Sequence, residues 1–225
     1  MYIKKNMLKI NEIFYSLQGE GTRAGRLCAF VRLAGCNLRC RWCDTDYAVN
    51  TNNSEVFSVA EIIDKIKIYN CNFVEITGGE PLLQNYCIKL IDELLGLNYE
   101  VAIETNGSIS LEKLNKKVIK IMDIKCPDSN MSYHNLFENL NYLDAKDEIK
   151  FVIASKTDFD WSIEIIAQHK LYEKVDNILF SAVVSDISYM ELAKLILSIS
   201  NKNIKNVVRM QLQYHKIIWG NIKGK

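Results

Sequence analysis

The sequence predicts an α/β fold, a partial and open barrel of the (β/α)6 type with mainly parallel strands. Short β-branched runs alternate along the chain with segments of helical periodicity, which is typical of βαβ units. The chain has 225 residues, of which 48% are apolar, so it can bury one substantial core. Roughly six strand–helix units are visible, too few for a closed eight-fold barrel, and we expect a single domain over residues 1–225.

The predicted strands are short runs rich in β-branched and aromatic residues. In chain order they are residues 29–33, 73–77, 101–105, 118–124, 148–154, 177–183 and 207–211. Helical segments lie between most of them, so successive strands are expected to lie parallel in one sheet.

Three helices are predicted from apolar residues repeating every three to four positions, over residues 58–69, 84–97 and 188–198. Ser58 and Glu61 match the S-x-x-E capping box at the start of the first helix. The residues expected to face the core are Ile62, Ile63, Ile66 and Tyr69 in the first helix and Ile88, Ile91, Leu94 and Leu95 in the second.

Polar clusters follow four consecutive predicted strands. In chain order they are a cysteine loop over residues 35–45, Gly78-Gly79-Glu80-Pro81, Glu104-Thr105-Asn106-Gly107 and Asp123-Ile124-Lys125-Cys126-Pro127. Reactive groups of parallel α/β barrels gather at the ends of strands, so the four clusters are expected to share one site. The only two prolines of the chain lie in these clusters, which indicates fixed loop geometry. The glycine pair lets backbone approach a ligand closely.

The cysteine loop places Cys36, Cys40 and Cys43 in the spacing C-x3-C-x2-C. Full protein ligation of a 4Fe–4S cluster takes four cysteines, so three on one loop would leave one iron open to another ligand. The alternative is zinc, whose closed sites take four ligands, usually as two separated pairs. No second pair follows here, and Cys28 lies in an apolar run where it is expected to pack as a small hydrophobe. The spacing therefore favours an iron–sulfur cluster.

Composition narrows the class of protein. The net charge of +1 argues against a nucleic-acid-binding protein, which usually has a basic face. No apolar run reaches eighteen residues and no secretory signal is visible, so neither a membrane span nor a disulfide framework is expected. We expect a cytoplasmic protein with free thiols.

The cysteine loop, followed one βα unit later by Gly78-Gly79-Glu80-Pro81, resembles the radical S-adenosylmethionine (SAM) superfamily. In that superfamily the open iron binds the amino and carboxylate groups of SAM. One electron from the cluster then cleaves SAM to a 5′-deoxyadenosyl radical, which abstracts hydrogen from the substrate. The resemblance covers most of the chain and implies the same partial barrel.

A narrower resemblance is to the 7-carboxy-7-deazaguanine synthase family of queuosine and deazapurine biosynthesis. The segments that carry it are residues 16–21, 30–36, 42–45, 103–107, 123–125 and 215–221. It implies ring contraction of 6-carboxy-5,6,7,8-tetrahydropterin to 7-carboxy-7-deazaguanine with loss of ammonia, assisted by Mg²⁺. The alternative is a radical SAM activase, which places a glycyl radical on a partner enzyme and shares the cysteine spacing and often an Asp-x-Lys element.

The resemblance implies a role for particular residues. Cys36, Cys40 and Cys43 would hold the 4Fe–4S cluster. SAM would contact Trp42, Cys43, Asp44, Gly79, Glu80, Asp123, Ile124, Lys125 and Ser181. The substrate would contact Leu17, Gln18, Gly19, Glu20, Arg32, Thr77, Glu104, Asn106 and His215, with the Arg32 guanidinium meeting its carboxylate. Thr45 would bind Mg²⁺ through its hydroxyl.

Some of these residues have an ordinary structural interpretation as well. Thr77 also suits a plain strand position, Asn106-Gly107 is a common turn pair, and His215 can pack against Trp219. Asp123 stands where many relatives have serine in a Ser-Pro-Lys segment, and it can pair with Lys125. The resemblance further implies a flavodoxin or ferredoxin-type electron donor and a homodimer, without contact to nucleic acid.

Overall fold

The computed structural model describes residues 6–52, 54–220, 222 and 224. The strands in this part of the chain are β1 (Met7–Leu17), β2 (Leu27–Leu33), β3 (Glu55–Ser58), β4 (Phe73–Gly78), β5 (Glu100–Thr105), β6 (Ile119–Asp123), β7 (Glu148–Ile153), β8 (Asn177–Ala182) and β9 (Val208–Gln211). The α-helices are α1 (Val59–Lys67), α2 (Tyr86–Gly96), α3 (Lys156–Gln168), α4 (Tyr189–Leu197), α5 (Lys202–Val207) and α6 (Tyr214–Trp219).

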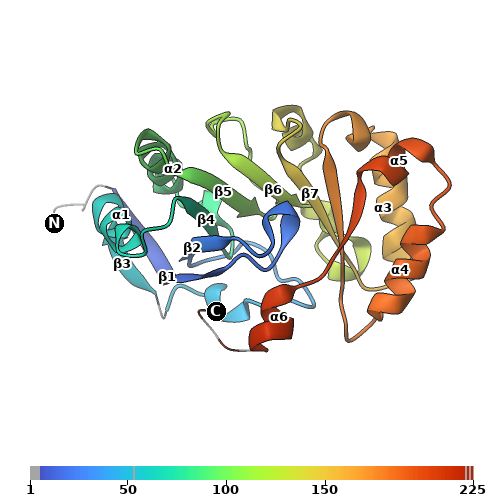
Figure 1. Cartoon of the computed structure of the whole chain (residues 1–225), viewed down its shortest axis with the longest axis horizontal. Coiled ribbons are helices and arrows are strands. Elements are labelled where there is room, and N and C mark those ends of the chain that lie inside the picture. Colours follow the sequence, from blue (N-terminus) through green and yellow to red (C-terminus); the bar gives the residue numbers. More distant parts are fainter. Residues whose placement is uncertain (1–5, 53, 221, 223, 225) are drawn as a thin grey trace.

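The described strands form one open sheet in the order β3-β1-β2-β4-β5-β6-β7-β8-β9. Strands β2 and β4 to β9 run parallel, while β1 pairs antiparallel with both β2 and β3. Figure 1 shows the sheet as a curved wall with α1 and α2 outside one end and α3 and α4 outside the other. The predicted α/β class and open, mainly parallel sheet are confirmed. The seven predicted strands are all present, whereas β1 and β3 were not predicted.

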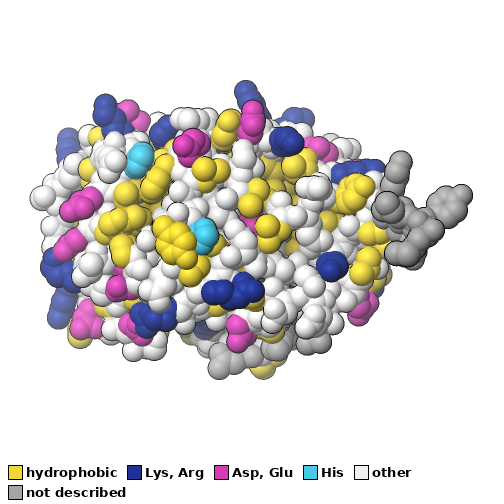
Figure 2. All heavy atoms as spheres, turned by 180° about the vertical axis from the view of Figure 1, so that it is seen from behind, with side chains coloured by type: hydrophobic (Ala, Val, Ile, Leu, Met, Phe, Trp, Pro, Cys, Tyr) yellow, Lys and Arg dark blue, Asp and Glu magenta, His cyan; other side chains and the backbone are white. Residues whose placement is uncertain are grey.

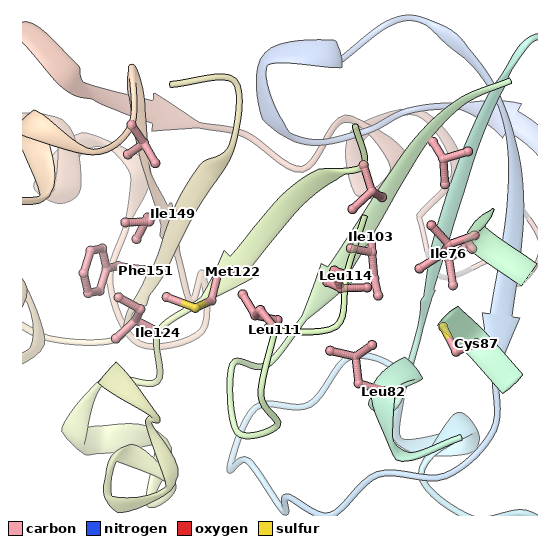
Figure 3. Packing of buried hydrophobic residues seen from close by; sticks show 14 of the residues in the cluster. Ile76, Leu82, Cys87, Ile103, Leu111, Leu114, Met122, Ile124, Ile149 and Phe151 are labelled. Atoms are coloured by element: carbon pink, nitrogen blue, oxygen red, sulfur yellow. The ribbon is translucent and has the colours of Figure 1, made fainter. Parts of the chain in front are cut away.

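The main core lies between the outer face of the sheet and the elements that cover it. In Figure 3, Ile76 of β4, Ile103 of β5, Met122 of β6 and Phe151 of β7 lie along this layer. No α-helix connects β5 to β6 or β6 to β7 in the described chain. Loops and short 3-10 turns cover the sheet there and contribute Leu111 and Leu114 to the core, so two expected crossover helices are absent.

The inner, concave face of the sheet carries a second apolar cluster. Its fully or nearly fully buried members are Cys28, Phe30, Phe73, Ala102, Ile119 and Ile121, with Phe14 packed against them. These residues alternate along the strands with members of the main core, as the two-residue period of a strand requires. The expectation that Cys28 packs as a small hydrophobe is confirmed, and the cluster forms a floor inside the barrel.

The helix predictions hold with one correction. The capping box of α1 is present, since Ser58 Oγ accepts from Glu61 N at 3.3 Å and Glu61 Oε2 accepts from Ser58 N at 2.7 Å. In α2 the buried residues are Cys87, Leu90, Ile91 and Leu94. Ile88 and Leu95 are only partly buried, because the buried stripe of α2 begins at Cys87, one position before the predicted Ile88.

Charged side chains of both signs are interspersed over the face seen in Figure 2. Among the described residues, none of the helices is both long enough and apolar enough to cross a lipid bilayer.

We expect Ser58→Ala to lower the free energy of unfolding by about 1 kcal/mol, because the variant leaves the backbone amide of Glu61 in the first turn of α1 without its acceptor. Urea unfolding followed by circular dichroism measures the change. Ser58→Asp is the control, since aspartate also caps helices and should retain most of the stability. An equal loss in both variants would contradict the capping role.

Candidate active site

A cavity of about 430 Å³ opens at the carboxyl ends of the parallel strands, a size usual for small-molecule sites. The four predicted polar clusters meet there because β2, β4, β5 and β6 are neighbours in register. Of the predicted site residues, which all lie in the described chain, every one lines the cavity except Glu80, Ile124 and Ser181. The sequence therefore predicted about half of the residues that line the cavity.

Gly78 and Gly79 allow two chain segments to pack closely against each other, in addition to allowing the close approach of a ligand. A Cβ on Gly79 would lie 2.2 Å from the carbonyl oxygen of Gly35, and one on Gly78 would lie 2.1 Å from that of Leu33. Gly78 also has a φ of +141°, which side chains disfavour. The glycine pair thus lets the end of β4 pack directly against the end of β2 and the start of the cysteine loop.

Cys36, Cys40 and Cys43 all line the cavity. Two N–H donors approach the Cys36 sulfur, from Leu38 N at 3.4 Å and from Asn106 Nδ2 at 3.7 Å. Burial raises the pKa of the Cys36 and Cys40 thiols, and the nearby Lys125 ammonium opposes that rise. Three thiols on one wall, with amide donors and a cation beside them, are a donor set that fits an iron–sulfur cluster. The described histidine, cysteine and acidic side chains form no group of three placed to hold one metal ion.

Glu80 lies behind the wall and is fully buried. Its carboxylate accepts hydrogen bonds from Thr105 Oγ1, from Asn106 N at 2.8 Å and from Leu82 N at 3.0 Å. Burial raises the pKa of Glu80, although these hydrogen bonds act in the opposite direction. The geometry shows Glu80 positioning Asn106 beside Cys36, and it offers no support for the expected direct contact with SAM.

Asp123 and Lys125 form the expected ion pair, with Lys125 Nζ 2.8 Å from Asp123 Oδ2. The other carboxylate oxygen, Asp123 Oδ1, is buried without a hydrogen-bond partner among the described residues. It is therefore suited to accept a bond from a bound ligand. The side chain of Ile124 belongs to the main core, whereas Ser181 Oγ accepts a hydrogen bond from Gln211, which lines the cavity.

Lys150 is the buried cation of the cavity. Its ammonium lies 2.9 Å from Glu20 Oε2, hydrogen-bonds Glu104 Oε1, and lies 4.0 Å from Asp123 Oδ2. Burial alone would lower the pKa of Lys150, but the three carboxylates raise it well above its usual value. Thr77 Oγ1 donates to the other oxygen of Glu104 at 3.2 Å. The carboxylates predicted to meet substrate are thus held by one lysine.

Helix α6 closes one side of the cavity. Its first residue donates from Tyr214 N to Gly19 O at 3.0 Å, and a Cβ on Gly19 would lie 2.5 Å from His215 Nδ1. Gly19 is therefore needed for His215 to reach the wall. Burial tends to raise the pKa of Asp44, but Lys216 Nζ, 3.0 Å away, brings it down to about 2. The tail motif thus folds over the segment that follows β1; its last residue, Asn221, lies outside the described residues.

The cysteine loop and its surroundings contain five of the six arginines, and the structure brings only one of these five to the cavity. Arg32 Nε donates to Glu12 Oε1 at 2.7 Å, which holds the guanidinium along the wall. Arg23 and Arg26 pair instead with Glu100, at the start of β5 and far along the strand from the site.

Sequence reasoning missed several polar residues of the wall, among them Glu75, Lys150, Gln211 and Gln213. Glu75 and Lys150 are charged residues in the middle of buried β-branched strands. Glu75 lies two positions before Thr77, so it shares the inward face of β4. A charge inside an otherwise apolar parallel strand was the signal that could have identified both residues.

We expect Lys150→Met to lower the free energy of unfolding by roughly 3–5 kcal/mol at pH 8, because three carboxylates lose their shared cation. Without Lys150, burial raises the folded-state pKa of Glu20, because the cation that lowers it is gone. Protonation then discharges Glu20 at low pH, so the destabilisation should be smaller at pH 5 than at pH 8. Urea unfolding of the cluster-free protein at both pH values measures this.

Lys120→Met is the matched control, because Lys120 is equally buried but pairs with one carboxylate, Asp147, at 2.6 Å. Its destabilisation should vary less with pH. Equal losses for Lys150→Met at pH 5 and pH 8 would contradict the three-carboxylate account.

Known proteins are similar to this chain in sequence and in fold. The radical SAM superfamily profile matches residues 31–196. A 7-carboxy-7-deazaguanine synthase of Clostridium acetobutylicum is 41% identical over 94% of this chain and 96% of its own length. One of Koribacter versatilis is 38% identical over 94% and 97%. The crystal structure of QueE from Escherichia coli has a TM-score of 0.72 at 23% identity, covering 91% of this chain and 94% of that one.

The relatives match nearly the whole chain at well over 30% identity, and the superfamily profile includes the cysteine loop and three further strand ends. The fold of the QueE structure agrees with the open parallel sheet seen here. The chain therefore belongs to the 7-carboxy-7-deazaguanine synthase family of the radical SAM superfamily.

Proposed function

We propose that this enzyme converts 6-carboxy-5,6,7,8-tetrahydropterin to 7-carboxy-7-deazaguanine and ammonia by radical SAM chemistry. The observation that carries the proposal is a single cavity with two chemically distinct ends. The cysteine loop lines one end, while Arg32 and the two carboxylates closest to Lys150, those of Glu20 and Glu104, line the other. A cluster-bound cofactor and a small polar substrate can thus lie side by side.

The cofactor end suits SAM by its chemistry. Cys36, Cys40 and Cys43 would hold the 4Fe–4S cluster, which supplies the electron that cleaves SAM. Asp123 Oδ1 is a buried acceptor on the same wall without a partner among the described residues, suited to a hydroxyl or ammonium of SAM. Trp42, Asp44, Gly79 and Lys125 line the wall beside it. Glu80, Ile124 and Ser181 would act from behind the wall.

The substrate end suits an acid with polar ring nitrogens. Arg32 would bind the substrate carboxylate, and its guanidinium fork matches that group. Thr77, Glu104 and Asn106 would contact the ring. Leu17, Gln18, Gly19 and His215 complete this end, which α6 shields from water. Glu20 would act mainly by orientation, since Lys150, Gln211 and Gln213 already hold its carboxylate.

Thr45 is the last residue of the cysteine loop. It lines the cavity and would bind Mg²⁺ through its hydroxyl. The ion would take its other ligands from water and the substrate carboxylate. It would serve to hold and polarise that carboxylate.

The proposal extends to the electron donor, oligomeric state, location and domain organisation of the enzyme. We propose a flavodoxin or ferredoxin-type electron donor, a homodimer, a cytoplasmic location and one domain over residues 1–225. The activase alternative is not favoured, because the relatives named above are 7-carboxy-7-deazaguanine synthases.

We expect Cys43→Ala to abolish product formation, because the variant loses one of three cluster ligands. The assay is anaerobic, with reconstituted protein, SAM, reductant, Mg²⁺ and 6-carboxy-5,6,7,8-tetrahydropterin, read by mass spectrometry. Cys71→Ala is the control, since Cys71 is half-buried at the opposite ends of the strands. SAM cleavage by the wild type without deazapurine product would contradict the proposed substrate while leaving the radical chemistry intact.

We expect Thr45→Val to raise the Mg²⁺ concentration needed for half-maximal turnover by about tenfold or more, because a methyl group replaces the ligand hydroxyl. Thr45→Ser keeps the hydroxyl and should behave like the wild type. The measurement is product formation across a Mg²⁺ titration after chelation. A wild-type rate that does not depend on Mg²⁺ would rule out this role for Thr45.

A further inference from the structure

Glu75 is a buried acid on the cavity wall that none of the roles above uses. It lies in the middle of β4, and only 3% of its surface is exposed. In the sheet register it stands between Phe30 of β2 and Ala102 of β5. It is therefore one inward position further from the end of β4 than Thr77, next to the apolar cluster inside the barrel.

Unlike the other acids of this wall, Glu75 has no ion pair within 4.0 Å among the described residues. The pairs of the others are Asp44 with Lys216, Glu20 and Glu104 with Lys150, and Asp123 with Lys125. A buried carboxyl costs free energy unless it is hydrogen-bonded. A residue of this kind that faces a ligand cavity is a candidate for ligand recognition.

Gln18 determines that the Glu75 carboxyl acts as a hydrogen-bond acceptor. Gln18 Oε1 accepts from Glu20 N at 2.9 Å, so its amide nitrogen faces the other way and donates to Glu75 Oε2. Gln18 is itself 4% exposed and lines the cavity. The two side chains form one fixed edge in which the carboxyl oxygens are the acceptors.

An aromatic surface adjoins this edge. The rings of Phe14 and Phe30 are stacked with centroids 4.8 Å apart, and both line the cavity. Phe30 is also the register partner of Glu75. A flat heterocycle packed on these rings would present its edge to Glu75.

We propose that Glu75, oriented by Gln18, binds the aminopyrimidinone edge of the substrate through its ring N–H and adjacent exocyclic amino group. The two donors lie side by side, as the donors of a guanidinium do, and a carboxylate accepts both at once. Glu75 then selects 2-aminated heterocycles at the end of the cavity away from the cysteine loop. This inference rests on the proposed function and names a specificity residue for it.

The charges around Glu75 predict how recognition depends on pH. The groups that face it are Cys28 of β2, Glu104 of β5, Lys150 and Glu148 of β7, and Glu20 after β1. Burial and the Glu104 and Glu20 carboxylates raise the pKa of Glu75 well above its usual value, against the effect of Lys150. Two donors from a ligand stabilise the ionised form, so binding releases a proton and tightens as pH rises.

The test compares 6-carboxy-5,6,7,8-tetrahydropterin with its analogue lacking the 2-amino group, using reconstituted wild type and Glu75→Gln. Glutamine keeps an acceptor for Gln18 but replaces the second acceptor by a donor. We expect the wild type to favour the aminated substrate about tenfold to hundredfold in kcat/KM. In Glu75→Gln this ratio should fall to about threefold or less, mainly through KM, and the fall of KM with rising pH should flatten.

Glu148→Gln is the matched control, because Glu148 is an equally buried strand acid that pairs with Arg23 and does not line the cavity. Its ratio should not fall below the wild-type value, because loss of the Glu148 charge favours the ionised form of Glu75. If Glu75→Gln slows both compounds equally and keeps the ratio, Glu75 only supports Gln18 and the inference is wrong. The wild-type ratio needs no variant, and a value near one would also overturn it. Failure of the wild type to convert the aminated substrate at all would instead overturn the proposed function.

Discussion

The polar interior depends on the ion pairs of Lys150. It joins β7 to the end of β1 through Glu20, to β5 through Glu104 and to β6 through Asp123. Three carboxylates gathered inside a barrel would repel one another and lose their hydration, and a single buried ammonium offsets both costs. Because the cation is central and the carboxylates come from different strands, the same contact fixes the spacing of strands and of ligand groups.

The position of α6 follows from that contact. Lys150 takes one oxygen of Glu20, and Gln211 and Gln213 donate to its carboxylate from β9 and the segment before α6. The end of the chain is thereby tied to the segment after β1, although about 190 residues separate them. Polar side chains hold this closure, so it leaves the cavity wall available for hydrogen bonding.

Local patterns predicted the parallel strands, the capping box of α1 and the cysteine end of the site, because each depends on residues close in sequence. The antiparallel β1 escaped prediction because its register against β2 shifts between Ile10 and Glu12, so its apolar residues do not alternate regularly. The hydrogen bond from Asn106 to Glu80 was not predicted, because the two residues lie on different strand ends that only the sheet topology brings together. The role of Lys150 depends on carboxylates that are distant in the sequence, and no local sequence pattern contains them.

Part of the substrate end of the cavity lies outside the superfamily match. Residues 31–196 contain the cysteine loop and the strand ends that follow it, which any enzyme of the superfamily needs to hold its cofactor. Gln18, Glu20 and His215 lie outside that range, yet Gly19 and Tyr214 are hydrogen-bonded and bring them together at the substrate end. Their contacts inside the range are Glu75 and Lys150, one on β4 and one on β7. Substrate choice can therefore change through the two ends of the chain and two inward strand positions, while the cofactor end stays intact.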